Sequence, residues 1–332
     1  MRRAIPLPLL VLLLLWLPAC NGSDPLVVYA GRAEVLVDPV VRAFEHETGT
    51  KVRVQYADTS QLAAMLLEEG DRTRADLFWA QDPATLGFLA DRGRLGAVPE
   101  ATLERVDPLF RDPEGAWVGT SGRARVLAVH QDRVPAEERP ASLEELTDPR
   151  WKGRIGWAPT NASFQAMVAA MIALEGREAT EAWLEGVQAN APRVYPSNTP
   201  AVLAVAHGEI DVALTNHYYL HRLQAEHGGT LPVDNHYLRD GSAGSLVSVA
   251  AIGVLAGTSR TEEAHRFLEW ILEEPAQRHF GDVNYELPLT LDVPPHPDLP
   301  PVVALDPPAL DLADLSRLEE TVRLLRDVGA MP

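Results

Sequence analysis

The stretch that decides the fold runs from Leu26 to Val54 and reads LVVYAGRAEVLVDPVVRAFEHETGTKVRV. It begins with a short β-rich run, Leu26–Tyr29, which Ala30-Gly31 closes. Four apolar residues then recur at helical spacing, namely Val37, Val40, Val41 and Phe44, and the pattern ends near Thr48-Gly49. A second β-rich run begins at Val52. Strand, helix and strand joined by short connections predict a parallel sheet that is covered by helices on both faces.

The same alternation continues outward along the chain. It predicts further strands at 76–79, 123–130, 154–156, 212–214 and 246–255, and further helices near 62–66, after 82–83, and at 164–174, 179–187, 218–226, 261–273, 275–280 and 310–326. The long apolar run 246–255 suits a strand that crosses between two lobes. The proline-rich segment 288–308 predicts no regular structure. We therefore expect a two-lobed α/β protein.

The N-terminus predicts export from the cytoplasm. Arg2 and Arg3 precede an apolar run from Ala4 to Ala19, which is too short for a comfortable membrane span and typical of a secretory signal. Leu17-Pro18-Ala19-Cys20 resembles a bacterial lipobox, so we interpret residues 1–19 as a signal peptide, Cys20 as a lipidated N-terminus and residues 20–25 as a tether. A plain secreted protein with a coincidental cysteine is the alternative.

Composition excludes several functions. The chain has 332 residues, 46% of them hydrophobic, and carries 29 Lys and Arg against 47 Asp and Glu, a formal net charge of −18. This surface repels polyphosphates, so we expect no nucleic-acid partner. The single cysteine rules out an intramolecular disulfide, a cysteine-rich zinc site and an iron–sulfur cluster.

The carboxyl ends of the strands place one pair of residues at the ligand edge of the sheet. Ligands of open parallel sheets lie beyond these ends, against helix N-termini. Tyr218 and Tyr219 follow a strand and begin a helix, so two phenols meet at that edge. Phenolate oxygen is a hard donor that suits a trivalent cation, and a bound cation lowers the pKa of a phenol. The alternative is that one ring packs in the core and the other lies on the surface.

Other residues at the same edge suit an anion. Thr160-Asn161-Ala162-Ser163 precedes a helix, so its N–H groups and hydroxyls form a candidate cradle, although helix capping explains the segment equally well. Arg32 and Arg123 offer guanidinium groups to an oxyanion, or are solvated arginines. His217 and His221 are four residues apart on a helix, a spacing open to zinc but without a third ligand nearby.

These residues lie in motifs that resemble the periplasmic ferric-ion-binding proteins, the solute receptors of iron(III) ABC importers. The resemblance covers nearly the whole mature chain and rests on these segments: 28–32, 44–49, 75–79, 122–126, 151–156, 208–213, Asn216-His217-Tyr218-Tyr219 and 323–325. The Asn-x-Tyr-Tyr element is the part specific to iron. The resemblance implies a periplasmic-binding-protein type II fold, in which hinge strands join two α/β lobes around a ligand cleft. It divides the chain into lobe 1, residues 26–125 plus 250–300, and lobe 2, residues 126–249 plus 301–332.

By position, the resemblance assigns a role to each candidate residue. Tyr218 and Tyr219 match the paired phenolate ligands of the metal. The positions that match anion contacts are Arg32, Arg123, Asn161, Ala162, Ser163, Asn198 and Asn216, with Gln81, Tyr29 and His217 as residues that support the site. The chain departs from the family at Ala33, Gln81 and Asn161, where members have a histidine, a glutamate and a tyrosine ligand. Only two protein ligands then remain certain, so Fe(III) would need further oxygens from carbonate or bicarbonate and from water.

The function implied is capture of Fe(III) with a synergistic carbonate or bicarbonate anion, by closure of the lobes about strands near 125–129 and 248–252. Delivery would be to an ABC permease in the inner membrane, by a monomer in the periplasm or outside the cytoplasmic membrane, anchored through Cys20. A same-fold receptor for a phosphonate, a thiamine-like cation or a polyamine is the alternative. We do not expect an enzyme, because the chain has no Gly-x-Ser-x-Gly elbow, His-Glu-x-x-His pair or phosphate-binding glycine loop.

Overall fold

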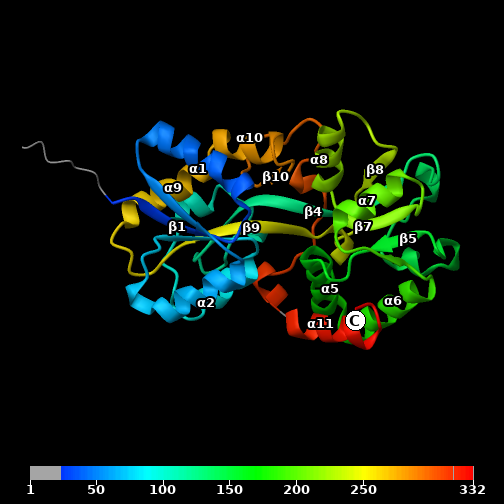
Figure 1. The fold of residues 1–332 in the computed structure, drawn as a ribbon. Helices are drawn as coiled ribbons and strands as arrows, with labels where there is room; N and C mark the ends of the chain where they lie inside the picture. Colours follow the sequence, from blue (N-terminus) through cyan, green and yellow to red (C-terminus); the bar gives the residue numbers. More distant parts are fainter. Residues whose placement is uncertain (1–23, 317, 332) are drawn as a thin grey trace, which may run out of the picture.

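The computed structural model describes residues 24–316 and 318–331, which form two α/β halves joined by long strands (Figure 1). The predicted signal peptide and Cys20 lie outside the described residues, as does most of the tether. Within the described part of the chain, no helix is long and apolar enough to cross a membrane.

The regular elements follow the predicted alternation closely. The strands are β1 (Leu26–Ala30), β2 (Val52–Tyr56), β3 (Leu77–Ala80), β4 (Val118–His130), β5 (Ile155–Trp157), β6 (Arg193–Val194), β7 (Val212–Asn216), β8 (Val233–His236), β9 (Val247–Val254) and β10 (Leu287–Pro288). The helices are α1 (Glu34–Thr48), α2 (Thr59–Glu69), α3 (Pro83–Ala90), α4 (Glu100–Leu103), α5 (Ala162–Glu175), α6 (Arg177–Ala189), α7 (Asn198–Ala206), α8 (Tyr218–His227), α9 (Thr261–Ile271), α10 (Glu274–Asp282) and α11 (Leu318–Asp327).

Local signals in the sequence account for several helix ends. Helix α1 buries Val37, Val40, Val41 and Phe44 and ends at Gly49, whose φ of 74° is the left-handed conformation that glycine adopts easily. Helix α3 begins after Asp82, whose Oδ1 accepts a hydrogen bond from the backbone N–H of Thr85 at 3.1 Å, with Pro83 in the first turn. Both ends lie where the sequence predicts them.

Strands β1, β2 and β3 pair in parallel, as the first segment predicts, but the sheet as a whole is mixed. Its strand order is β2-β1-β3-β9-β4-β7-β5-β6. The outer strands of each half pair in parallel, whereas β9 is antiparallel to both β3 and β4, and β4 is antiparallel to β7. The antiparallel centre was not predicted, because β4 and β9 pair with strands that are far apart from them in the sequence.

Strand β4 passes from one half to the other within two residues. It pairs with β9 as far as Ala124, opposite Val247, and with β7 from Arg125, opposite Asn216. Ser121, Arg123 and Arg125 alternate along this strand, so their side chains leave it on the same face. The crossing point therefore presents three polar side chains in a row.

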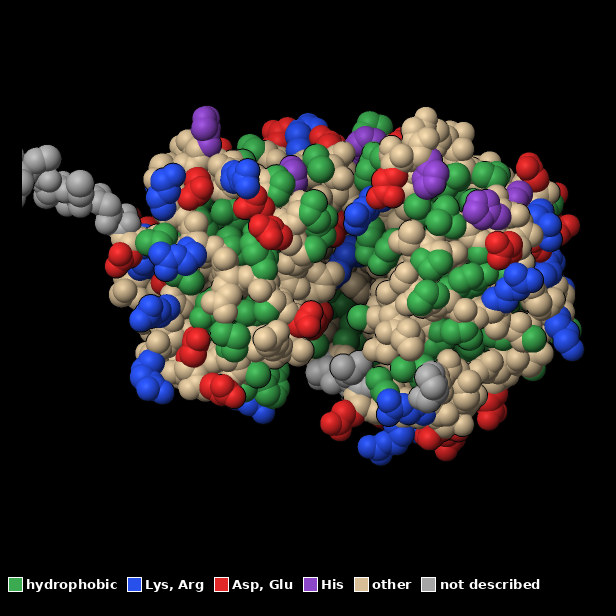
Figure 2. Space-filling model, viewed as in Figure 1, with side chains coloured by type: hydrophobic (Ala, Val, Ile, Leu, Met, Phe, Trp, Pro, Cys, Tyr) green, Lys and Arg blue, Asp and Glu red, His purple; other side chains and the backbone are tan. Residues whose placement is uncertain are grey.

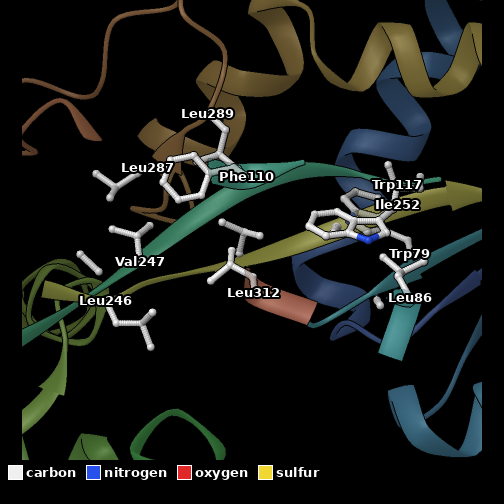
Figure 3. Close-up of a cluster of buried hydrophobic side chains, with 14 of the residues drawn as sticks. Trp79, Leu86, Phe110, Trp117, Leu246, Val247, Ile252, Leu287, Leu289 and Leu312 are labelled. Atoms are coloured by element: carbon white, nitrogen blue, oxygen red, sulfur yellow. The ribbon is translucent and has the colours of Figure 1, made fainter. Parts of the chain in front are cut away.

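The hydrophobic core surrounds the crossing strands in the first half (Figure 3). Trp79 and Ile252 are fully buried, and Leu287 and Leu289 pack against β4 from the segment that follows α10. Leu312 lies next to β9 (Figure 3) and belongs to η8 (Leu312–Ser316), a 3₁₀ helix. The core packs against the crossing strands and positions the polar face of β4.

The structure contains elements that were not predicted, namely α4, β6, α7, β8 and β10, and it divides one predicted helix. Helix α7 was not predicted, because Pro200 lies in its first turn and interrupts the helical pattern. The helix expected at 310–326 is divided into η8 and α11, of which η8 packs against α3 and α11 against α5 (Figure 1). The C-terminal segment thus touches both halves, and the predicted lobe limits stay a prediction.

Candidate metal and anion site

The tyrosine pair lies at the end of β7, in the first turn of α8. The Tyr218 and Tyr219 rings stack with centroids 4.2 Å apart and an interplanar angle of 28°, and both side chains are half-buried. Tyr219 packs against a small apolar cluster formed by α7 and α8, which includes Val202 and Leu220. Packing therefore holds one ring, and stacking aligns the second ring with it.

Electrostatics keeps Tyr218 protonated without a metal. Burial raises the pKa of its hydroxyl well above the ordinary value, and neighbouring Tyr219, which hydrogen-bonds to it, raises the pKa further. The positive charge of Arg123 acts in the opposite direction. A cation that binds here must displace a phenol proton, and only a small ion of high charge does this strongly at neutral pH.

Four polar residues, together with the backbone of Ala162, form a cradle beside the pair. Asn161 caps α5, where its Oδ1 accepts from the N–H of Ser163 at 3.0 Å and from the Ser163 hydroxyl at 2.7 Å. Asn198, the first residue of α7, donates through Nδ2 to Ser163 Oγ at 3.0 Å. Asn216 ends β7, and Ala162 begins α5. The structure thus brings together Asn161, Ala162, Ser163, Asn198 and Asn216, which lie far apart in the sequence.

Arg125 completes this cradle, and the sequence analysis missed it. Its Nη1 donates to Ser163 Oγ and to Asn216 Oδ1, both at 3.1 Å. Burial lowers the pKa of the guanidinium to about 10, which the two tyrosines partly oppose. Arg125 Nε and Nη2 and Asn198 Oδ1 are buried without a partner among the described residues. Alternation along β4 was the available signal, because it puts Arg125 on the same face as Arg123.

Arg32 is differently placed and corrects the expectation that it faces an external anion. Its Nη2 donates to Glu286 Oε1 at 2.6 Å and its Nη1 to Ser121 Oγ at 3.0 Å, and Ser121 in turn donates to Glu286 Oε2 at 2.5 Å. Arg32 and Glu286 are each 3% exposed. Burial opposes ionisation of Glu286, but Arg32 and Arg123 outweigh it and lower the pKa of this carboxyl. We name Arg32, Ser121 and Glu286 the arginine–glutamate triangle.

Arg123 lies between the triangle and the tyrosine pair. Its Nη2 donates to the backbone oxygen of Gln81 at 2.6 Å, and its Nε is buried without a described partner. Burial lowers the pKa of Arg123, while Glu286 raises it and Arg32 lowers it. Gln81 therefore supports the site through its main chain.

His217, the residue before Tyr218, attaches the tyrosine turn to β4. It is fully buried, and its Nδ1 accepts from the backbone N–H of Ala124 at 3.1 Å. Burial, reinforced by His221, lowers the pKa of His217 to about 4, so its ring is neutral. The two histidine rings are 6.4 Å apart, and no group of three or more His, Cys, Asp or Glu side chains suited to a metal occurs in the described residues. The zinc alternative lacks support there.

Tyr29 does not belong to the site, contrary to the prediction. Its hydroxyl donates to Glu69 Oε1 at 3.0 Å, near the C-terminal end of α2. The first residue of that helix, Thr59, instead donates its hydroxyl to the backbone oxygen of Gly31 near the ligand edge. Ten residues of helix span about 15 Å, so the Tyr29 hydroxyl points to the opposite end.

A cleft of about 770 Å³ separates the two halves. Residues of α2 and α3 line one side, and Ala162, Gln165, Ala166 and Ala169 of α5 line the other. Figure 2 shows basic side chains between the two halves, above hydrophobic ones, whereas the residues that line the cavity itself include no Lys or Arg. Tyr218 and Tyr219 do not line this cavity, but Gln81 and Ala162 do, and they connect it to Arg123 and to the cradle.

Similarity to characterised proteins extends over nearly the whole chain. Residues 73–311 match the family described as bacterial extracellular solute-binding protein. The chain is 31% identical to an Fe(3+)-binding periplasmic protein of Serratia marcescens over 316 residues, which are 94% of this chain and 93% of that protein. It is also 31% identical to the major ferric iron-binding protein of Neisseria meningitidis, with 92% of each chain covered.

Solved structures give the same result for the fold. Iron-bound HitA from Pseudomonas aeruginosa superimposes with a TM-score of 0.82 at 36% identity, covering 92% of this chain and 99% of that one. A Trichodesmium protein in complex with iron and citrate ligands superimposes with a TM-score of 0.82 at 26% identity and the same coverage. The expected two-lobed binding-protein fold is confirmed.

Proposed function

This chain belongs to the family of bacterial extracellular solute-binding proteins, and from that premise we propose that it captures Fe(III) together with a synergistic carbonate or bicarbonate anion. Family membership makes it a binding protein rather than an enzyme, in agreement with the sequence prediction. It would work outside the cytoplasmic membrane and deliver iron to an ABC permease, as a monomer held by a lipid on Cys20.

The stacked pair Tyr218–Tyr219 beside two buried arginines is the observation that carries the proposal. Fe(III) is a hard cation that binds phenolate oxygen strongly. Its charge offsets the burial that keeps Tyr218 protonated, so binding would release the phenol protons. The names of the matched relatives agree with this chemistry, since the Serratia and Neisseria proteins are described as ferric-iron binders.

The cradle would hold the anion. Two phenolates leave one positive charge on Fe(III), which one bicarbonate cancels. Arg125 Nε and Nη2 and the N-terminus of α5 offer donors to such an anion. Ala33, Gln81 and Asn161 supply no charged ligand, so anion and water oxygens would complete the coordination of the metal. Iron binding should therefore be unusually dependent on the anion.

Another anion or another solute is the alternative. The Trichodesmium protein holds iron with citrate, so an organic carboxylate is a direct competitor for carbonate. Of the other solutes considered, a phosphonate suits the cradle. A polyamine or a thiamine-like cation is disfavoured because Arg123 and Arg125 are buried there without a carboxylate hydrogen-bonded to them among the described residues.

Closure of the two halves would trap the ion. Strands β4 and β9 connect the halves, and Arg123 and Arg125 flank the point where β4 changes partner. A hinge at these strands would move the cradle and tyrosines toward Gln81 and enclose the metal. The closed pair of lobes would then form the surface that the permease recognises.

Titration with Fe(III) tests the proposal directly. We expect a visible phenolate-to-iron charge-transfer band in buffer that contains bicarbonate, and a much weaker apparent affinity in carbonate-free buffer. Absence of colour in both buffers would favour the phosphonate alternative. Undiminished affinity without carbonate would remove the anion from the proposal and retain the iron.

A further inference from the structure

In the arginine–glutamate triangle, Glu286 is the negatively charged partner of Arg32. Without it, Arg32 would need an external anion as its partner. Arg32 Nη1 and Nη2 both have partners, and both oxygens of Glu286 accept hydrogen bonds. Arg125, only two residues beyond Arg123 on the same strand face, instead keeps Nε and Nη2 unpartnered among the described residues. Arg32 Nε is also buried without a partner among the described residues, so the difference lies in the carboxylate: Arg32 already has one within the fold, and Arg125 has none.

Glu286 is held in place from three directions. Its backbone N–H donates to Phe280 O at 2.8 Å at the end of α10, and β10, which begins at the next residue, pairs with β4 opposite Ser121 and Gly122. The preceding residue, Tyr285, has a φ of 55°, which is unusual for a side chain of this size. Its ring stacks on His221 of α8 with centroids 5.4 Å apart. The strained backbone at Tyr285 therefore accompanies the placement of the Glu286 carboxylate beside Arg32.

We infer that Glu286 is a positioning residue that acts as a resident anion on Arg32, so that the iron site takes one external oxyanion per Fe(III) rather than two. This rests on the proposed function. The external anion binds on the Arg125 side of the tyrosine pair, in the cradle. Arg32 and Glu286 balance each other and stay together whether or not the metal is bound.

The charges near the tyrosines make the inference specific. Arg123 and Arg125 have no ion pair among the described residues, whereas Arg32 pairs with Glu286. Converting Glu286 to glutamine removes one negative charge and leaves Arg32 buried without an anion. A second bicarbonate would restore the balance, because it offers a guanidinium the same two oxygens that the carboxylate offered.

The experiment measures how iron affinity depends on bicarbonate concentration. Apparent Fe(III) affinity is determined at fixed pH by competition with EDTA over a range of bicarbonate concentrations. We expect a log–log slope near one for the unaltered protein and a slope approaching two for Glu286→Gln. The variant should also lose affinity at low bicarbonate by at least about tenfold, because one negative charge near the metal is gone, and recover at high bicarbonate.

Glu69→Gln is the matched control, since Glu69 is a carboxylate hydrogen-bonded to Tyr29 away from the site, and its slope should stay at one. If Glu286→Gln does not fold, Ser121→Ala removes only the hydroxyl that links Arg32 to Glu286, and a smaller increase in slope is expected. A slope of two for the unaltered protein, or an unchanged slope in folded Glu286→Gln, overturns the inference. Failure of the proposed function would be seen earlier, as absence of iron binding by the unaltered protein.

Discussion

The arginine–glutamate triangle and the cradle are built from the same kinds of group, yet they leave opposite amounts of hydrogen-bonding capacity unused. In the triangle, a buried guanidinium, a hydroxyl and a carboxylate satisfy one another at 2.5 to 3.0 Å. In the cradle, a buried guanidinium, a hydroxyl and three amides leave Arg125 Nε and Nη2 and Asn198 Oδ1 without described partners. The triangle leaves one donor, Arg32 Nε, without a described partner but contains its own carboxylate, whereas the cradle leaves three atoms without partners and contains no carboxylate.

This difference separates structural arginines from binding arginines. A buried polar group without a partner costs about 1–3 kcal/mol, so a fold retains such groups only where something compensates them. Arg32, which the sequence analysis placed beside the anion, has its partners in the fold. Arg125, which it did not select, has the donors that a solute needs. The predictions below test this contrast, beginning with the largest expected effect.

Removing both phenol oxygens should abolish strong Fe(III) binding beside the cradle. In Tyr218→Phe/Tyr219→Phe the stacked rings remain, while the two phenol oxygens that the proposal assigns to the metal are lost. We expect Fe(III) affinity to fall by at least about 10⁴-fold, or about 5.5 kcal/mol, with loss of the charge-transfer band. Spectrophotometric titration measures this. Tyr29→Phe, whose hydroxyl contacts Glu69, should bind as before, and retained binding by the double variant would place the metal elsewhere.

Breaking the triangle should mainly affect stability. Glu286→Ala leaves Arg32 buried without its anion, so the free energy of unfolding should fall by about 3–5 kcal/mol. Urea unfolding of the metal-free protein gives the value. Glu274→Ala removes the partner of Arg278 in an exposed ion pair of equal length, 2.6 Å, and should destabilise the protein far less, because solvent screens this pair. Equal losses in both variants would contradict the internal role of Glu286.

His217, which supports the tyrosine turn between the two regions, should make the metal-free protein sensitive to acid. Burial holds its pKa at about 4 in the folded state, below the ordinary value near 6.5. Between these two pKa values, His217 is protonated in the unfolded chain but neutral in the folded chain. The free energy of unfolding should therefore fall by about 3 kcal/mol as the pH decreases from about 6.5 to 4. Unfolding curves of His217→Gln should show a flatter profile over this range, and an identical profile would reject the assignment.

A single amide of the cradle should have the smallest effect. Asn198→Asp keeps the shape but adds a negative charge at Ser163, beside the proposed anion position. We expect Fe(III) affinity in bicarbonate buffer to fall about tenfold, or about 1.4 kcal/mol, with the colour of the complex unchanged. Titrations with and without bicarbonate measure the change. An equal loss in carbonate-free buffer would mean that Asn198 does not act through the anion.

Most of the fold was predictable because it is encoded locally. The helical spacing of apolar residues in α1, the cap at Asp82 and the glycine at Gly49 each act within a few residues. The antiparallel centre of the sheet was not predictable, because the pairing of β9 with β3 and β4 depends on strands far apart in the sequence. Helix α7 was missed because Pro200 obscures its pattern.

The site was predictable to a similar degree. Tyr218, Tyr219, Asn216 and residues 161–163 follow strands or begin helices, so the rule for sheet edges selects their turns. Asn198 came only from the family resemblance, because helix α7, which it begins, was not predicted. Arg125 had a local signal in the alternation along β4. Tyr29 was misplaced because its position after a strand does not reveal which end of α2 its hydroxyl reaches.

The order of apolar and polar residues by itself determined the two-lobed α/β architecture and the presence of two adjacent phenols at the ligand edge, because periodicity and capping act over short distances. Only the tertiary structure decided which arginine is free to bind. Arg32 and Glu286 are 254 residues apart and meet because β10 pairs with β4. A buried charge is governed by the nearest opposite charge, and that neighbour is known only when the chain is folded.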